Sequence, residues 1–436
     1  MLSFDHWLSI ILLIGACLTI VILIVLYIQG VFRRRIHYKI FNFPSTNAPN
    51  FALTIASLSD SFISNAEVKN FWVKADEIQP ARLEAIRRAQ HRILFETYIM
   101  TPGERANAFA TALIEKANAG VKIQVVVDSY GAKSVTERYW KNLEIHGIEV
   151  RFFNPFSWRS PYDYLQRSHR KLLLIDDQIA LIGGAGMSDY WDGIPEQGDR
   201  APWFDFEVQF EGPVVERLHG LFIQHWLDSG KTIDLSQNPL PQETSIQQLQ
   251  TFQPTVLVTS GEDPSYRDSS IRALYQTLVM AAQSRIWIAS PYFLPFSNIQ
   301  KLLIDAKHRG VDVRILTMGS KTDKPFVHYS ARELYKNLLR EGIEIYEYQP
   351  SMMHAKTLLI DDCWVSLGSA NFDPRSFWSN DELNLSTSQP FLCEKIENFL
   401  LNGFQESQRI TYQEWKRRPL MQKIRGKVML LFYLLL

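Results

Sequence analysis

Two short segments of the sequence place a histidine, a lysine and an aspartate at the same spacing. SHRKLLLIDD (residues 168–177) is repeated further along as MHAKTLLIDD (353–362). The shared residues are His169, Lys171 and Asp176 in the first segment and His354, Lys356 and Asp361 in the second. Side chains two apart on an extended strand point the same way, so each histidine shares a face with its lysine. Two imidazoles and two ammonium groups around one point suit a phosphate. The lysines would neutralise its oxygens, one histidine would attack phosphorus, and the other would protonate the leaving alcohol.

The aspartate of each motif comes at the far end of its aliphatic strand, beside a tight turn. Asp176 and Asp361 belong to the candidate catalytic set as motif members, but we favour a structural role in which they hold that turn. A glycine-containing turn follows at the same distance in both halves, GGAGMSDYW from residue 183 and GSANFDPRS from residue 368. Such turns let backbone N–H groups approach a phosphate. One motif of this kind has little specificity, whereas two in a duplicated register are specific.

The elements that position these motifs also occur twice. AGVKIQVVV (119–127) is echoed by RGVDVRIL (309–316), and KNLEIHGIEV (141–150) by KNLLREGIEI (336–345). The echoes keep one order at an offset of roughly 175 to 195 residues, which is too long for a solenoid unit and indicates a duplicated domain. Within each copy, near-continuous aliphatic strands alternate with helical patterns. We therefore expect an α/β fold in which each sheet is covered on both faces.

Changes in composition set the expected domain boundaries. The polar stretch 235–254 is the predicted linker between a first domain at 45–234 and a second at 255–413. Residues 414–436 combine basic and apolar side chains and are too short to span a bilayer. Two interpretations of this tail stay open: an interfacial membrane contact, or a terminal helix docked on the second domain.

Residues 1–40 are predicted to form a transmembrane anchor with a basic flank. The stretch from Trp7 to Ile28 carries no charge and is long enough to span a bilayer. A secretory signal would need positive charge before a shorter apolar core, whereas here Arg33, Arg34 and Arg35 follow it. The positive-inside rule then predicts a single-pass protein of the cell inner (plasma) membrane, with the catalytic domains in the cytoplasm.

The composition argues against several classes of function. The 436 residues include 46 Lys and Arg and 46 Asp and Glu. The chain therefore lacks the surplus of basic residues that is typical of nucleic-acid-binding proteins. The three cysteines have neither the spacing of metal ligands nor that of a disulfide framework. We therefore expect no metal site and no nucleic-acid partner, and the oligomeric state is left open.

The pattern H-x-K-x4-D-x6-G-S-x-N, complete in the second half and varied in the first, resembles that of the phospholipase D superfamily. AIRRAQHRILFETYI, IASPYFLP and GSANFDPRSFWSNDELN resemble its bacterial cardiolipin synthase branch more closely. The resemblance extends over residues 70 to 415. It implies two tandem α/β/α sandwich domains with pseudo-two-fold symmetry that share one active site. It also implies chemistry through a covalent phosphohistidine, without a cofactor.

The resemblance implies a role for each matching residue. His169 matches the nucleophile, His354 the acid that protonates the leaving group, and Lys171 and Lys356 the phosphate clamps. The supporting residues are Ser369 and Asn371 as second-half donors, Glu382 as the carboxylate that orients a histidine, and Glu207 as its first-half equivalent in the WxxxE register, with Asp205 on the same strand face as a further candidate.

One position departs from the family pattern. Gly186 occupies the place of the first-half asparagine, so that side-chain donor to phosphate is missing. Backbone N–H groups of the turn that contains Gly184 and Gly186, or a bound water, would replace it. We expect a weakened first half-site and a modest rise in activity on Gly186→Asn.

The implied function is a membrane-anchored phosphatidyltransferase that makes cardiolipin from phosphatidylglycerol or a related phospholipid pair. The first alternative is a hydrolytic phospholipase D or a nuclease of the same superfamily, because transfer and hydrolysis differ in how the pocket excludes water. The second is a non-catalytic membrane scaffold. A scaffold would be expected to have lost a histidine or a lysine from one motif, and neither motif has.

Overall fold

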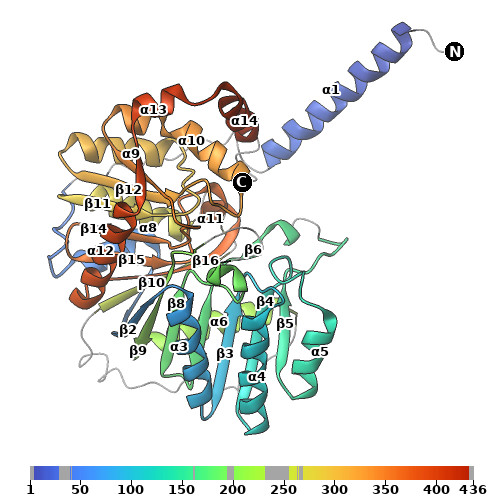
Figure 1. Cartoon of the computed structure of the whole chain (residues 1–436), viewed down its shortest axis with the longest axis vertical. Helices are drawn as coiled ribbons and strands as arrows, with labels where there is room; N and C mark the ends of the chain where they lie inside the picture. The colour runs from blue at the N-terminus through green and yellow to red at the C-terminus, as the bar shows by residue number, and fades with distance from the viewer. Residues whose placement is uncertain are drawn as a thin grey trace.

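The computed structural model describes residues 4–28, 40, 42–160, 163–193, 201–230, 255–262, 264 and 269–431. The basic flank at 33–35, the predicted linker at 235–254 and the last residues of the tail, 432–436, lie outside the described residues. Helix α1 (Phe4–Ile28) projects alone from the body of the molecule (Figure 1). Within the described part of the chain it is the one helix long and apolar enough to cross a membrane, over His6–Ile24.

The first domain is built on a seven-stranded sheet in the order β2-β9-β8-β7-β3-β4-β5. In that order the strands are β2 (Glu67–Val73), β9 (Phe206–Glu211), β8 (Ile179–Gly183), β7 (Leu172–Ile175), β3 (Arg92–Thr97), β4 (Lys122–Asp128) and β5 (Glu149–Phe153). Strands β3, β4 and β5 are parallel and the other pairings are antiparallel. The helices of this domain are α3 (Ala75–Arg88), α4 (Glu104–Asn118), α5 (Glu137–Ile145) and α6 (Val214–Asp228), with the short 3-10 helices η1 (Asp163–Leu165) and η2 (Asp189–Asp192).

The aliphatic strands of this sheet are buried on both faces, as predicted. Leu172 and Leu174 of β7 pack on the side of α6, whereas Leu173 and Ile175 pack on the side of α3 and α4. Because alternate side chains of a strand point to opposite faces, a run of four aliphatics can serve two helical layers at once.

The second domain repeats the arrangement and extends it at both edges. Its ten-stranded sheet runs β1-β10-β16-β15-β14-β11-β12-β13-β17, with β6 paired to β16. The strands are β1 (Phe62–Asn65), β10 (Thr255–Gly261), β16 (Asn380–Thr387), β15 (Trp364–Gly368), β14 (Thr357–Ile360), β11 (Arg285–Ala289), β12 (Asp312–Met318), β13 (Glu344–Tyr348), β17 (Ser407–Ile410) and β6 (Arg167–Ser168). The helices are α2 (Phe51–Ser59), α8 (Ser270–Ala281), α9 (Ser297–His308), α10 (Pro325–Arg340), α11 (Pro374–Trp378), α12 (Pro390–Gln405), α13 (Tyr412–Arg417) and α14 (Leu420–Leu430).

The two sheets share one strand order, which is the structural form of the duplication. Strands β10-β16-β15-β14-β11-β12-β13 follow one another as β2-β9-β8-β7-β3-β4-β5 do. The expected boundary at residue 45 differs from the structure, because α2 packs in the core of the second domain and β1 pairs with β10. The first sheet therefore begins at β2. Helix α2 and strand β1 thus belong to the second domain although they precede the first domain in the sequence.

The domains meet through an apolar core. One buried cluster contains side chains of α6 and β7 from the first domain together with side chains of α12 and β14 from the second. Phe204 stacks on Phe399 with ring centroids 4.1 Å apart, and Phe71 and Phe206 also contact Phe399. Such a large apolar interface holds the two halves of the active site in fixed relation.

Candidate active site

Each histidine motif is carried to the domain boundary by the same backbone device. Ser168 pairs in parallel with Asp381 of β16, and the His169 N–H donates to the Asp381 carbonyl at 2.8 Å. In the other half, Met353 bridges Phe204 in parallel, and the His354 N–H donates to the Phe204 carbonyl at 2.9 Å. Each motif is therefore anchored on a strand segment of the opposite domain.

Each histidine is also oriented by a carboxylate of the opposite domain. His169 Nδ1 lies 3.1 Å from Glu382 Oε2 and 3.0 Å from the Ser369 carbonyl oxygen. His354 Nδ1 lies 3.1 Å from Asp205 Oδ2. A carbonyl oxygen only accepts, so His169 Nδ1 carries a proton and Nε2 keeps its lone pair. In both histidines Nδ1 lies against a carboxylate of the opposite domain. The His354 ring also contacts Lys356, whose Nζ lies 2.9 Å from Nδ1 and 3.1 Å from Nε2.

The structure separates the two first-half carboxylate candidates. Gly183 pairs with Glu207 across β8 and β9, as Gly368 pairs with Asn384 across β15 and β16. The position equivalent to Glu382 is therefore Asp205, two residues before Glu207, and the WxxxE register is shifted by two. Glu207 instead forms a buried ion pair with Arg82, whose Nε donates to it at 2.7 Å.

Both orienting carboxylates have their remaining oxygens occupied. The Ser376 hydroxyl donates to Glu382 Oε1 at 2.7 Å, and the Ser369 hydroxyl donates to Oε2. For Asp205, Trp191 Nε1 donates to Oδ2 at 2.9 Å and the Phe206 N–H donates to Oδ1 at 2.9 Å. Ser369, expected as a phosphate donor, thus holds Glu382. Trp191 and Ser376 were not singled out from the sequence, because their contact with a carboxylate depends on the fold.

The two lysines are buried beside the histidines. Lys171 Nζ donates to the His169 carbonyl at 2.6 Å, and Lys356 Nζ donates to the His354 carbonyl at 2.5 Å. Burial lowers the pKa of Lys171 to about 8 and that of Lys356 to about 7. Burial and the charges of both lysines lower the pKa of His169 well below its usual value. Burial and Lys356 lower that of His354 to about 4, against the pull of Asp205.

The pKa values of the two orienting carboxylates, Asp205 and Glu382, are shifted in opposite directions. Burial opposes ionisation of Asp205, but His354 and Lys356 outweigh it, so the pKa of Asp205 is lowered. Burial raises the pKa of Glu382 to about 8, against Lys171 and the two serines. Burial and mutual repulsion thus lower the pKa values of the histidines and lysines, and the negative charge of a bound anion would raise them.

Comparisons with known proteins agree with this geometry. The family described as "Cardiolipin synthase, PLD-like domain" matches residues 83–190 and 275–402. A cardiolipin synthase of Geobacillus sp. (strain WCH70) is 31% identical over 371 residues, 84% of this chain and 72% of the relative. Cardiolipin synthase A of Pseudomonas fluorescens (strain SBW25) is 30% identical over 370 residues, 84% of this chain and 74% of the relative. The chain belongs to the PLD-like cardiolipin synthase family.

Membership confirms the resemblance of the motifs and makes the chain a phosphatidyltransferase-class enzyme of the phospholipase D superfamily. The crystal structure of phosphatidylserine synthase from Haemophilus influenzae Rd KW20 has the same fold, with a TM-score of 0.66 at 14% identity. That similarity covers 88% of this chain and 99% of the other. The predicted tandem PLD-like α/β architecture is thereby confirmed.

The motif aspartates lie at the opposite ends of their strands from the histidines. Asp176 accepts the backbone N–H groups of Gln90, His91 and Arg92 at 2.7 to 2.8 Å. Asp361 accepts those of residues 283, 284 and 285 at 2.7 to 3.2 Å. Both have left-handed backbones, with φ of 52° and 50°. This geometry does not place Asp176 and Asp361 among the catalytic groups and supports the structural role favoured from the sequence, in which they hold the strand-end turn.

The glycines of the first turn admit neighbouring groups. A Cβ on Gly184 would lie 2.3 Å from Asp205 Oδ1, so only glycine lets that carboxylate reach His354. A Cβ on Gly186 would lie 2.8 Å from the Ile99 carbonyl oxygen and 3.1 Å from the Trp191 ring. In the second turn the Asn371 side-chain oxygen is buried and accepts no hydrogen bond within the described residues.

This crowding reverses the expected effect of Gly186→Asn. We predict lower turnover, because the new side chain displaces Trp191, which holds Asp205, or the backbone of Ile99. Overpacking of this kind costs about 1–3 kcal/mol of stability. Steady-state turnover and thermal melts of Gly186→Asn and Gly186→Ala give the measurement, and both should show the loss because the Cβ causes it. A Gly186→Asn enzyme more active than the parent would instead support the rise in activity expected from the sequence.

Binding of an anion should draw protons into the site. Sulfate is a suitable phosphate analogue, because it does not titrate in the range where Lys356 (pKa about 7) and Lys171 (pKa about 8) do. Its charge should raise both pKa values, so we expect proton uptake on binding between pH 7 and 8, and an affinity that falls as the pH rises further. Calorimetry in two buffers of different ionisation enthalpy measures this. Lys356→Met should reduce the uptake, and sulfate binding that strengthened with pH would contradict the assignment.

Sequence reasoning missed a buried histidine behind the first motif. His225 of α6 lies between Glu96 of β3 and Asp381 of β16, with Nδ1 to Glu96 Oε1 at 2.5 Å and Nε2 to Asp381 Oδ2 at 3.2 Å. The Ser168 hydroxyl donates to Glu96 at 2.6 Å. Burial opposes protonation of His225, but its carboxylate partners outweigh burial and raise its pKa. This network holds the residue next to His169 from the face opposite the site.

Loss of His225 should therefore misplace His169. His225→Gln leaves two buried carboxylates without their cation, which costs about 3–5 kcal/mol of stability. Below the melting temperature we also expect slower turnover than in the parent. His328→Gln is the matched control, since His328 is equally buried and lies 3.4 Å from Glu347 in the second domain, where Arg332 still pairs with Glu347. Equal turnover in the two variants would mean that the His225 network only stabilises the fold.

Aromatic rings surround both histidines. Tyr98 meets the His169 ring edge-on at 5.1 Å between centroids. In the second motif, Trp191 and Trp203 pack against the His354 ring, with centroid distances of 5.1 and 5.4 Å. These rings pack against the imidazoles and contribute to the burial of both histidines.

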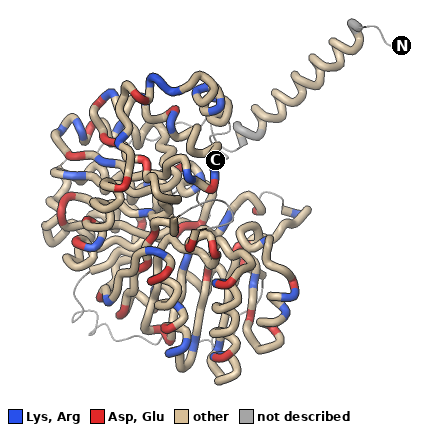
Figure 2. The backbone as a smooth tube through the Cα atoms, in the orientation of Figure 1, with Lys and Arg blue, Asp and Glu red and all other residues tan. Residues whose placement is uncertain are grey.

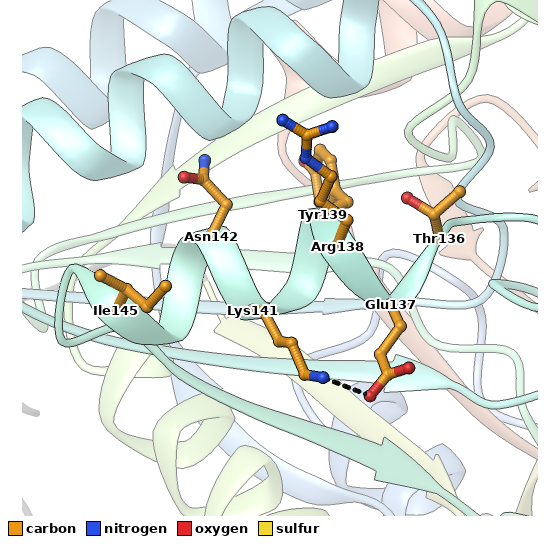
Figure 3. A pocket seen from close by; sticks show the side chains of 7 residues that line it. All are labelled: Thr136, Glu137, Arg138, Tyr139, Lys141, Asn142 and Ile145. Carbon is orange, nitrogen blue, oxygen red and sulfur yellow. Dashed lines mark ion pairs between the residues drawn. The ribbon is translucent and has the colours of Figure 1, made fainter.

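Two further surface features lie outside the motif network. The segment after β5 exposes Phe156 and Trp158, whose rings contact each other at 4.9 Å, and its residues 161 and 162 lie outside the described part. A hollow on α5 is lined by one short stretch of chain and holds the Lys141–Glu137 ion pair at 2.8 Å (Figure 3). None of its lining residues belongs to the motifs or their partners. Among the described residues, no group of three or more His, Cys, Asp or Glu is placed to hold a metal ion.

Proposed function

We propose that this enzyme transfers a phosphatidyl group between two phospholipids at a membrane, with phosphatidylglycerol in both roles, and so makes cardiolipin and glycerol. The observation that carries the proposal is the crossed pairing of His169 with Glu382 and of His354 with Asp205. It brings two carboxylate-oriented imidazoles and two buried lysines to one domain boundary. This is the equipment for a double displacement at a phosphodiester.

In the first step, His169 Nε2 attacks the phosphorus of the donor lipid. The P–N bond forms as the bond from phosphorus to the head-group glycerol oxygen breaks, and that oxygen takes a proton from His354 Nε2. Lys171 and Lys356 balance the charge on the phosphoryl oxygens. The donor phosphate raises the pKa of His354 from about 4 by offsetting the lysine charges, so that the imidazole holds the proton it must give.

In the second step, the hydroxyl of the acceptor lipid loses its proton to His354 Nε2 and attacks the same phosphorus. The P–O bond forms and the P–N bond to His169 breaks, which returns both histidines to their starting states. One phosphodiester is exchanged for another, so the reaction is close to neutral in free energy and requires no nucleotide.

The products of a single assay test the proposal. Purified enzyme given phosphatidylglycerol labelled in its acyl chains should produce labelled cardiolipin and free glycerol. Labelled phosphatidic acid as the main product would instead identify a hydrolase. No lipid product with any of several phospholipids would refute the proposal and point to the nuclease or scaffold alternatives.

We further propose that α1 anchors the enzyme in the cell membrane with both catalytic domains on the cytoplasmic side. The apolar length of α1 and the arginines at 33–35 support this orientation. In intact cells, a cysteine engineered into residues 235–254 should be protected from a membrane-impermeant thiol reagent. Labelling from outside would refute the orientation.

A further inference from the structure

We propose that helix α14 lies flat on the surface of an anionic lipid bilayer and fixes the orientation of the catalytic domains against it. The inference rests on the proposed membrane location of the enzyme and is independent of which lipid product it makes. In Figure 1, α1 leaves the body at the end of the molecule that carries α14. The two helices would therefore contact one membrane, α1 by crossing it and α14 by lying along it.

One face of α14 and of the residue after it is apolar and exposed. The exposed fractions are 72% for Leu420, 58% for Met421, 46% for Ile424, 44% for Val428 and 82% for Leu431. At about 100° per residue these five side chains fall within a stripe about 100° wide. A soluble helix end would be expected to present polar side chains there.

The opposite face of α14 is fixed to the second domain. Gly426 is buried against α10, where an added Cβ would lie 2.7 Å from the Tyr329 carbonyl oxygen. Trp415 of α13 donates from Nε1 to the Arg332 carbonyl at 2.5 Å, and Arg418 pairs with Glu333 at 2.9 Å. Of the two interpretations of the tail, docking is thus present in the structure, and the docked helix still turns an apolar stripe outward.

The charges on α14 favour an anionic lipid surface as its partner. Lys423 and Lys427 lie along one side of the stripe and Arg425 along the other, and α14 carries no acidic residue. Lys416 and Arg417 precede it on α13, and Figure 2 shows this concentration of Lys and Arg along α13 and α14. Long basic side chains flanking an apolar stripe place their charges among lipid phosphates while the stripe enters the acyl region. An anionic bilayer satisfies both parts of the pattern.

A fluorescent label on the stripe tests the contact directly. Cys17, Cys363 and Cys393 of the full chain are first replaced by alanine. A single cysteine at position 424 is then labelled with an NBD fluorophore, and the protein is reconstituted in vesicles of phosphatidylcholine and phosphatidylserine that contain a nitroxide-bearing lipid. We expect about a twofold loss of emission by contact with the nitroxide. The matched control is a label at Ile145, which is 81% exposed on α5 (Figure 3) and should keep its emission.

The outcomes separate the alternatives. An equal fractional loss of emission to the nitroxide lipid at positions 424 and 145 overturns the proposal. A label at 424 that is shielded from water but not quenched by the nitroxide lipid also overturns it, because a second copy of the chain would then cover the stripe. Lys423→Ser with Lys427→Ser should reduce the quenching in vesicles that contain phosphatidylserine, and the difference from the parent should shrink when phosphatidylserine is omitted. Because the readout is fluorescence, it holds even if the enzyme proves to make a product other than cardiolipin.

Discussion

His169→Ala should abolish both turnover and the covalent phosphatidyl-enzyme, whereas His354→Ala should still form the adduct, slowly, and accumulate it. Only His169 has the role of attacking atom in the proposed sequence, and His354 acts on the protons of the two alcohols. Loss of a member of such a catalytic unit lowers turnover by about 10⁴- to 10⁶-fold. Acid quenching after incubation with lipid labelled in the acyl chains measures the adduct.

A buried histidine outside the site gives the control for this experiment. His219 lies on α6, and its Nδ1 is 3.0 Å from Asp177 Oδ1. His219→Ala therefore removes a buried imidazole without changing the histidine or lysine of either motif. It should keep most of the turnover. An adduct found on His354 in the parent enzyme, or adduct formation by His169→Ala, would reverse the assignment of nucleophile and acid.

The second large effect concerns Asp205. Asp205 accepts hydrogen bonds from His354, Trp191 and the Phe206 N–H, and its pKa is lowered although burial opposes this, so it acts as an ion. An asparagine has only one oxygen, so its amide N–H₂ must face at least one of these donors. Asp205→Asn should therefore turn or displace His354 and lower turnover by about 10⁴-fold, the loss known for the equivalent change in a serine-protease triad.

The partner carboxylate should behave differently. Burial raises the pKa of Glu382 to about 8, so a neutral amide resembles the protonated form that Glu382 adopts below that pH. For Glu382→Gln we expect a smaller loss, because a hydrogen bond to a charged group contributes about 1.5–3 kcal/mol. Glu207→Gln, two residues from Asp205, should lower the melting temperature through Arg82 and leave the pH profile of turnover unchanged. A larger loss in Glu207→Gln than in Asp205→Asn would restore the WxxxE register.

The motifs and the duplicated fold could be predicted because their signals are local. The spacing of His169 and Lys171 and the aliphatic run of β7 each lie within a few residues, and the alternation of a strand decides where they point. The equivalence of Asp205 and Glu382 was not accessible in the same way. It depends on how β8 pairs with β9, and the tryptophan used to align the halves is two residues out of step with that pairing.

Other features were missed because they join distant parts of the chain. Glu96, His225 and Asp381 come from three elements, and no spacing links them. The placement of β1 was missed because its partner β10 follows some two hundred residues later. The sequence of a short, half-exposed strand does not indicate which sheet the strand joins. The effect of Gly186→Asn required the position of the Ile99 carbonyl.

The crossed carboxylates also set the moment at which the enzyme becomes active during its synthesis. His169 is made early, but Glu382, which orients it, is 213 residues further along the chain. Asp205 is already present when the first domain folds, yet the histidine it serves is still to be translated. In the proposed mechanism, a ribosome-bound first domain would therefore carry His169 without the carboxylate that orients it. The same dependence means that a chain truncated before β16 should be inactive, because His169 would lack Glu382.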